Sequence, residues 1–187
     1  MSSSESKFIV RTAEAEDAEF VSIGIREAER CNVGVGIYDA LIGQSLESIE
    51  ATNREGEDET SRYLKHAYLH DTKSHVYMGN FLVAVDTSNG QVVACCCNFP
   101  YPEFKLTASI PGFETALVTA LNYSTEQAGS AFDNWSFLDS AFPDVDYDNS
   151  WMLEAVYVLP AYRGQGLAQL IVQANMDAQA SRKHLTT

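Results

Sequence analysis

The sequence has no long hydrophobic run. Its longest apolar stretches, residues 81–85 and 92–97, are far shorter than the roughly 20 residues that an α-helix needs to cross a bilayer. Residues 1–7 contain neither a basic leader nor an apolar segment of the kind that a secretory signal requires. We therefore expect no membrane partner, a location in the cytoplasm with the nucleus as the alternative, and a flexible polar tail over residues 1–6.

Basic residues are scarce. The chain has 12 Lys and Arg against 26 Asp and Glu, a formal net charge of -14. Such a charge repels a phosphate backbone over most of the surface, so we expect no nucleic-acid partner. A negative field would favour the approach of cationic substrates such as amines, although acidic surfaces commonly serve solubility alone. The acidic stretch 133–149 permits the same two interpretations, an amine-attracting rim or a solvated loop.

Cysteine and histidine are also few, and their spacing does not favour a metal site. Cys95, Cys96 and Cys97 are consecutive, so in a strand they alternate between faces and form neither a disulfide nor a chelate easily. We expect reduced, partly buried thiols. His66 and His70 are four residues apart in a predicted helix, but no third ligand has suitable spacing. We therefore interpret them as surface residues and expect no metal.

With 187 residues and 45% hydrophobic content, the chain can bury one good core, and we expect a single domain over residues 7–187. Asn89 and Gly90 predict a tight turn between two β-rich runs. Hydrophobic spacing predicts strands at 8–11, 80–85, 91–98 and 151–158, and helical segments near 18–28, 38–49, 63–68, 113–121 and 165–182. The expected fold is α/β (α+β), with a mostly antiparallel central sheet, the hairpin and the last strand at its middle, and helices on both faces.

The junction of the last strand and the last helix carries the clearest chemical signal. Pro160 ends the strand, and Gly164 and Gly166 lead into the helix. Glycines lack the Cβ atoms that would block a ligand, and the first amides of a helix are unpaired and favour an anion. A phosphate-hydrolase loop would need Lys-Ser or Lys-Thr where Leu167 follows, and a dinucleotide loop would need Gly or Ala at Gln169. Both alternatives therefore fail.

The loop instead resembles the coenzyme A (CoA) pyrophosphate loop of the GCN5-related N-acetyltransferase (GNAT) superfamily. That pattern, Gln/Arg-x-x-Gly-x-Gly/Ala, is matched by Arg163, Gly166 and Ala168, with Val158 and Pro160 ahead of it. The run 9–13 with Asp17 and the hairpin 81–98 resemble the family's first three strands. The resemblance covers the framework, whereas residues 31–75 and 99–150 look longer and more individual.

The resemblance implies an N-acetyltransferase that uses acetyl-CoA as acyl donor and no metal, by direct attack of a primary amine on the thioester. It implies that the backbone of Val156 and Val158 binds the pantetheine arm. The pyrophosphate would bind to the backbone amides of Arg163, Gly164, Gln165, Gly166, Leu167 and Ala168.

Glu154 is the candidate general base, because it is the one charged residue in an otherwise apolar strand. Strict alternation would place it on one face with Met152, Val156 and Val158, and would point Tyr157 the other way into the core. Burial would raise the pKa of Glu154 and suit it to base catalysis. The alternative is a structural glutamate that pairs with an arginine or caps a loop.

The end of the chain departs from the family pattern. No tyrosine follows Tyr162, so no general acid can be assigned. The sequence reaches its last residue, Thr187, before the fifth strand that the resemblance implies. We therefore expect a C-terminally short domain with a sheet open beside its fourth strand. Two functional classes follow: an acetyltransferase for a small or protein amine, or a CoA-binding or interaction module with weak or no activity. A homodimer or a completing partner is a further expectation.

Overall fold

The computed structural model describes residues 6–31, 34–44, 47, 49, 58–70, 77–100, 106–132 and 151–185, without the side chains of 106–109 and 181–185. Four strands form one sheet in the order β1-β2-β3-β4, and each neighbouring pair is antiparallel. Their bounds are β1 Phe8–Thr12, β2 Phe81–Asp86, β3 Val92–Pro100 and β4 Trp151–Val158. The mostly antiparallel central sheet is therefore confirmed.

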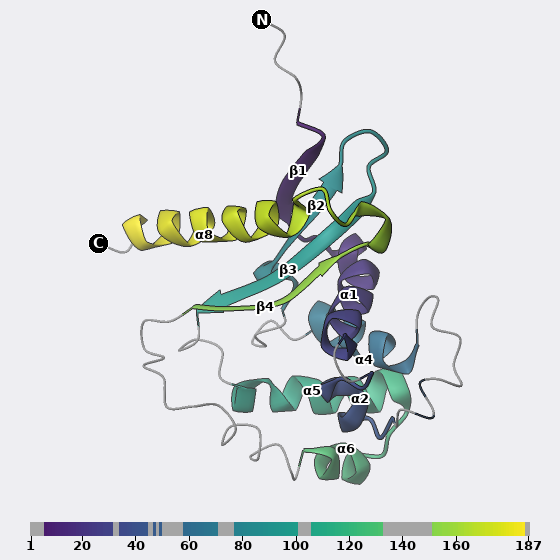
Figure 1. The fold of residues 1–187 in the computed structure, drawn as a ribbon. Coiled ribbons are helices and arrows are strands. Elements are labelled where there is room, and N and C mark those ends of the chain that lie inside the picture. Colours follow the sequence, from purple (N-terminus) through teal and green to yellow (C-terminus); the bar gives the residue numbers. More distant parts are fainter. Residues whose placement is uncertain are drawn as a thin grey trace, which may run out of the picture.

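Helices cover both faces of the sheet, as expected. Figure 1 shows α8 on one side and α1, α4 and α5 on the other. The helices are α1 Ala18–Arg30, α2 Ile37–Leu41, α4 Glu59–His70, α5 Leu106–Leu121, α6 Thr125–Ala131 and α8 Leu167–Leu185, with short 3-10 turns at η1 Ala15–Asp17, η2 Met78–Asn80 and η4 Pro160–Tyr162. Along the described part of the chain, no helix has the length and apolarity that a membrane crossing requires.

The cysteine triplet follows the alternation expected of a strand. Cys95 and Cys97 belong to the apolar cluster on the α1 side of the sheet, and Cys96 belongs to the smaller cluster under α8. All three side chains are fully buried and none forms a disulfide, whereas Cys31 is exposed. Burial raises the pKa of Cys96 to about 11, so this thiol stays protonated and unreactive at neutral pH.

Ion pairs connect the helices below the sheet. Arg30 of α1 donates two hydrogen bonds to Asp39 of α2, and Thr60 of α4 donates to the same carboxylate at 2.6 Å. Arg26 and Arg30 also pair with Asp58, just before α4, at 3.1 and 3.0 Å. Because these charges are mostly buried, their mutual bonds fix the positions of α1, α2 and the start of α4 relative to one another.

Some expectations differ from the structure. The helix expected over residues 38–49 is interrupted: α2 ends at Leu41, a turn with Gly43 at a φ of 74° follows, and residues 47 and 49 are again helical. The strand β4 is the outermost of the described sheet rather than central. The acidic stretch 133–149 and residues 1–5 lie outside the described residues.

Candidate active site

The loop between η4 and α8 has the conformation that its glycines allow. Gly164 and Gly166 have φ values of 76° and 78°, in the left-handed region that other residues avoid. A Cβ built on either glycine would meet no atom within 4 Å. The glycines are therefore required by the backbone conformation, and the space in front of them is open to a ligand.

The start of α8 presents unpaired backbone amides at this loop. The bond from Leu170 N to Gly166 O, at 2.9 Å, is the first of the helix. The amides before Leu170 consequently have no partner inside the helix. Ala168 and the loop residues are exposed, and the positive end of the helix dipole faces the same open space. This geometry suits a pyrophosphate group.

Two basic residues frame the loop in this acidic protein. Arg163 donates from Nε to the Val158 carbonyl at 3.1 Å. Lys7 comes from the other end of the chain and donates from Nζ to Gln165 Oε1 at 2.9 Å. Lys7 was not predicted from the sequence, because no spacing pattern connects residues 158 positions apart. Both cations would favour an anionic ligand at the loop.

The end of β4 leaves a backbone donor at the open edge of the described sheet. Leu159 N donates to Val93 O across the ladder at 2.9 Å. In an antiparallel pair, successive residues alternate between facing the partner strand and facing away from it. The N–H of the preceding residue, Val158, therefore points away from β3. The predicted role of Val158 and Val156 in binding a pantetheine arm stays a prediction.

A β-bulge in β4 changes the face on which Glu154 lies. Cys97 pairs with Glu154 and Cys95 with Tyr157, so β4 has two residues, including Ala155, where β3 has one. Ala155 has a φ of 54°, which marks the extra residue. Glu154 and Tyr157 consequently lie on the α1 side, where Tyr157 packs against Phe20 with ring centroids 5.9 Å apart.

The prediction that Glu154 shares a face with Val156 and Val158 is therefore wrong. Those two valines pack in the cluster under α8, on the opposite face of the sheet. The bulge is the physical reason, since one inserted residue reverses the alternation for everything beyond it. The expected packing of Tyr157 in the core is confirmed.

The structure brings a second carboxylate close to Glu154. Burial raises the pKa of Glu154 to about 7. Burial, and then the charge of Glu154, raise the pKa of Glu29 in α1 to about 8. Sequence reasoning missed Glu29, because it lies in the charged run 26–30 that is typical of a solvent-facing helix surface. A pair of carboxyl groups with near-neutral pKa values is suited to exchanging protons at physiological pH.

Two tyrosines complete the surroundings of this pair. Burial raises the pKa of Tyr38 well above its ordinary value, and the charges of Glu29 and Glu154 raise it further. The pKa of Tyr68 is also raised by burial, with smaller contributions from the same two carboxylates. The fully buried Tyr68 hydroxyl has no hydrogen-bond partner among the described residues.

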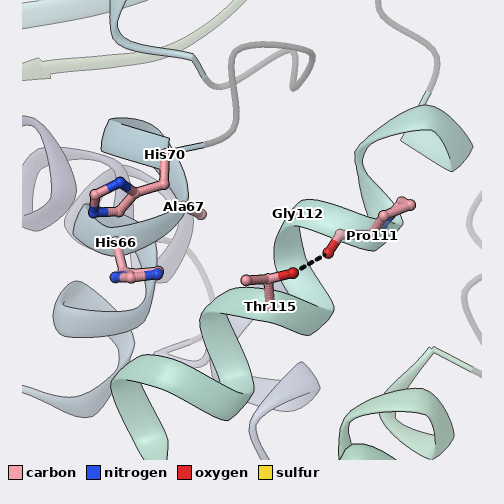
Figure 2. Close-up of a pocket in the computed structure, with 6 residues that line it drawn as sticks. All are labelled: His66, Ala67, His70, Pro111, Gly112 and Thr115. Carbon is pink, nitrogen blue, oxygen red and sulfur yellow. Dashed lines mark hydrogen bonds between the residues drawn. The ribbon is translucent and has the colours of Figure 1, made fainter.

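His66 and His70 lie apart from this cluster, at a cavity of about 240 Å³ between α4 and α5. Figure 2 shows both imidazoles on α4, opposite Pro111 and Thr115 of α5. His66 Nε2 lies 3.0 Å from Thr119 Oγ1, and burial, followed by the charge of His70, lowers the pKa of His66. Within the described ranges, no three His, Cys, Asp or Glu side chains gather as a metal site.

Comparison with known proteins gives one family and several distant structural neighbours. The family model described as "Acetyltransferase (GNAT) family" matches residues 44–185. The similar solved structures include an N-acetyltransferase from Staphylococcus aureus Mu50, with 13% identity, a TM-score of 0.45, and coverage of 91% of this chain and 75% of that one. A structure described only as an acetyltransferase has 14% identity, a TM-score of 0.46, and coverage of 92% and 75%.

A third neighbour is mosquito arylalkylamine N-acetyltransferase like 5b, with 15% identity, a TM-score of 0.41, and coverage of 93% of this chain and 71% of that one. The comparison with curated protein sequences gives no match. The assignment therefore rests on the family model, which spans most of the chain and includes β2, β3, β4 and the glycine loop before α8. On that basis, the chain belongs to the GNAT family of acetyltransferases.

Proposed function

We propose that this protein transfers an acetyl group from acetyl-CoA to a primary amine by direct attack of the amine on the thioester. The observation that carries the proposal is the open glycine loop at the start of α8, which directly follows the strand that holds Glu154. The glycine loop would thus offer an anion site and β4 a proton acceptor, and the reaction needs both.

Several residues fit the coenzyme. The exposed amides of Gly164, Gln165 and Gly166 would bind its pyrophosphate, and Lys7 and Arg163 would offset its charge. The outward N–H of Val158 is available for the pantetheine arm. When bound, acetyl-CoA supplies a thioester carbonyl, and a backbone donor at the β4 edge would stabilise the oxyanion formed there.

Glu154 is proposed as the general base. An amine arrives largely as an ammonium ion at neutral pH and must lose a proton before it can attack. A carboxyl group with a pKa of about 7 is partly ionised under the same conditions and can accept that proton. The position of Glu154 on the α1 side indicates that the amine approaches from the face covered by α1, α2 and α4.

Thiol release from acetyl-CoA in the presence of a panel of amines tests the proposal. We expect release that depends on the amine and on Glu154, with kcat reduced about 100-fold or more in Glu154→Gln. The matched control is Glu19→Gln. Glu19 is an exposed glutamate of α1 that pairs with Lys65 at 3.5 Å. Acetyl-CoA binding without turnover of any amine would instead support a CoA-binding or interaction module.

A further inference from the structure

Lys7 and Arg163 form no ion pair with any described carboxylate. Every other Lys or Arg whose side chain the structure describes pairs with Asp or Glu, namely Arg11, Arg26, Arg30, Arg62 and Lys65. Cations without an acidic partner stand out in a chain with 26 acidic and 12 basic residues. Both flank the glycine loop before α8, where their positive charge is available to an anionic ligand.

The acidic residue across the strand ladder does not neutralise Lys7. Asp86 pairs with Phe8, the neighbour of Lys7, between β1 and β2. Its carboxylate accepts hydrogen bonds from Ser88 Oγ at 2.6 Å and Ser88 N at 2.9 Å. These bonds lower the pKa of Asp86, and the charge of Lys7 contributes less than they do. Lys7 Nζ donates instead to the neutral amide oxygen of Gln165 at 2.9 Å, in the glycine loop.

Lys7 is held in place at this position. Thr87 donates from N and from Oγ1 to the Lys7 carbonyl, each at 3.0 Å. The ammonium group lies 4.9 Å from the centre of the Phe8 ring, and Phe8 meets the ring of Tyr162 edge to face, with centroids 6.3 Å apart. An ammonium group has three N–H donors, and Gln165 uses one of them. Lys7 therefore has donors left for a ligand at the loop.

The turn between β2 and β3 fixes the same corner of the molecule. Tyr162 of η4 donates from its hydroxyl to Gln91 Oε1 at 3.2 Å and accepts from Asn89 Nδ2 at 3.3 Å. The start of β1, the hairpin turn and η4 are thus connected by direct contacts. Lys7 consequently keeps a fixed position relative to the glycine loop, as a preorganised binding group requires.

Arg163 approaches the loop from the other edge of the sheet. Leu159 N donates to Val93 O, so the preceding residue, Val158, faces away from β3. Arg163 Nε donates to this outward carbonyl of Val158 at 3.1 Å, which places its guanidinium at the outer edge of β4. Lys7 precedes β1, the opposite edge of the described sheet, three inter-strand spacings or about 14 Å from β4. Figure 1 shows the start of α8 beside β1.

The proposed coenzyme has three phosphates that are not equivalent. Two form the pyrophosphate, from which the pantetheine arm leaves at one phosphorus and the nucleotide at the other. The third is a monoester on the ribose and carries about two negative charges at neutral pH, as other phosphate monoesters do. If the pantetheine arm follows the outer edge of β4, the nucleotide extends toward β1. Lys7 is the described cation on that side of the loop.

We propose that Lys7 binds the ribose 3′-phosphate of the coenzyme, so that the acyl donor is a complete acyl-CoA. A thioester on dephospho-CoA, or on the phosphopantetheine of a carrier protein, lacks this phosphate and is a poorer donor. The inference rests on the proposed acetyltransferase function and specifies its donor class. Lys7 contacts a group that takes no part in the chemistry, so it determines specificity and is not a catalytic residue.

A binding experiment tests this role without any turnover. Calorimetry with the full chain compares CoA with 3′-dephospho-CoA, which differs by the one phosphate. We expect CoA to bind to the wild type about threefold to tenfold more tightly, as one exposed, charge-assisted contact implies. Lys7→Gln should lower the affinity for CoA to that for dephospho-CoA and leave the affinity for dephospho-CoA unchanged. Equal affinities in the wild type, or a preference that survives in Lys7→Gln, would overturn the inference.

Two further variants separate the charge of Lys7 from its packing. Lys7→Arg keeps a cation and should keep most of the preference for CoA. Lys65→Gln removes a cation that pairs with Glu19 in the helical layer, and should change neither affinity. Circular dichroism confirms that each variant is folded. An equal loss of affinity for both ligands in Lys7→Gln would place Lys7 at the pyrophosphate and reject its role at the 3′-phosphate.

Transfer assays distinguish failure of this inference from failure of the proposed function. Equal kcat/KM for acetyl-CoA and acetyl-dephospho-CoA would reject the role of Lys7 and leave acetyl transfer intact. A preference for CoA in binding, without acetyl transfer to any amine, would keep the role of Lys7 and reject the proposed function. A wild-type chain that binds neither ligand would overturn both.

Discussion

Arg30 and Asp39 form a buried, two-point ion pair, with Nε to Oδ2 at 2.7 Å and Nη2 to Oδ1 at 2.5 Å. Only 7% of the arginine side chain and 1% of the aspartate are exposed. Gly36 N donates to the same carboxylate at 2.8 Å, and the next residue, Ile37, donates from its N to Glu29 Oε2 at 3.0 Å. This pair therefore connects the stability of the helical layer to the position of Glu29.

Asp39→Asn should destabilise the fold by about 3–5 kcal/mol, because it leaves the Arg30 charge buried without its full partner. Urea unfolding followed by circular dichroism measures the change. The exposed pair of Glu19 and Lys65 is the control, where Glu19→Gln should cost at most about 1 kcal/mol. A loss of stability at Asp39 as small as at Glu19 would contradict the proposed role of the pair.

Stability should fall in acid through the paired aspartates. Burial by itself would raise the pKa of Asp17, but hydrogen bonds from Arg11 and from the Glu14 backbone outweigh it and lower the pKa below its usual 3.8. A group whose pKa is lower in the folded state stabilises the fold above its unfolded pKa, and this contribution is lost as pH falls through the folded value. Melting temperatures from pH 6 to pH 3 should therefore drop less steeply in Asp17→Asn than in wild type.

Glu29 should show the opposite dependence on pH. Its pKa of about 8 in the folded protein exceeds the ordinary value of 4.5, so folding favours the protonated form. The stability of the wild type should fall as pH rises from about 4.5 to 8, while Glu29→Gln escapes this loss. The melting temperature of the variant should exceed that of wild type most clearly at pH 9, and a difference that does not grow with pH would reject the raised pKa.

Gly166→Val should abolish detectable CoA binding, since a β-branched residue resists a φ of 78° and its side chain would fill the open space before α8. The matched control is Gly43→Val, which imposes the same backbone strain at a φ of 74° after α2, with equally open surroundings. Calorimetry with CoA distinguishes them. Equal loss of binding in both variants would point to general destabilisation instead of a lost site.

Lys7→Ala should weaken CoA binding about threefold to tenfold, because the ammonium group at Gln165 contributes charge to an anion site. The effect should shrink as the salt concentration rises, since salt screens exposed charges. Binding isotherms at 50 mM and 500 mM salt provide the measurement, and an effect that is independent of salt would indicate a packing role for Lys7.

The local features of the fold were predictable from the sequence. The hairpin 81–98 follows from Asn89-Gly90 between β-rich runs, and the glycine loop follows from Gly164 and Gly166 between an apolar strand and a helix. Each of these signals is contained within a short segment and depends on backbone conformation or side-chain periodicity. For this reason the glycine loop could be located before any tertiary contact was known.

Tertiary structure alone decided which groups surround Glu154 and the glycine loop. Strict alternation placed Glu154 on the wrong face, because an extra residue near Ala155 is invisible to a period-two pattern until the pairing with Cys95 and Cys97 is seen. Glu29 resembled an ordinary surface charge until α1 packed against β4. Lys7 reaches Gln165 only because β1 and α8 lie together in the fold. The sequence determined the elements and the glycine loop, whereas packing determined which side chains lie beside Glu154 and Gln165.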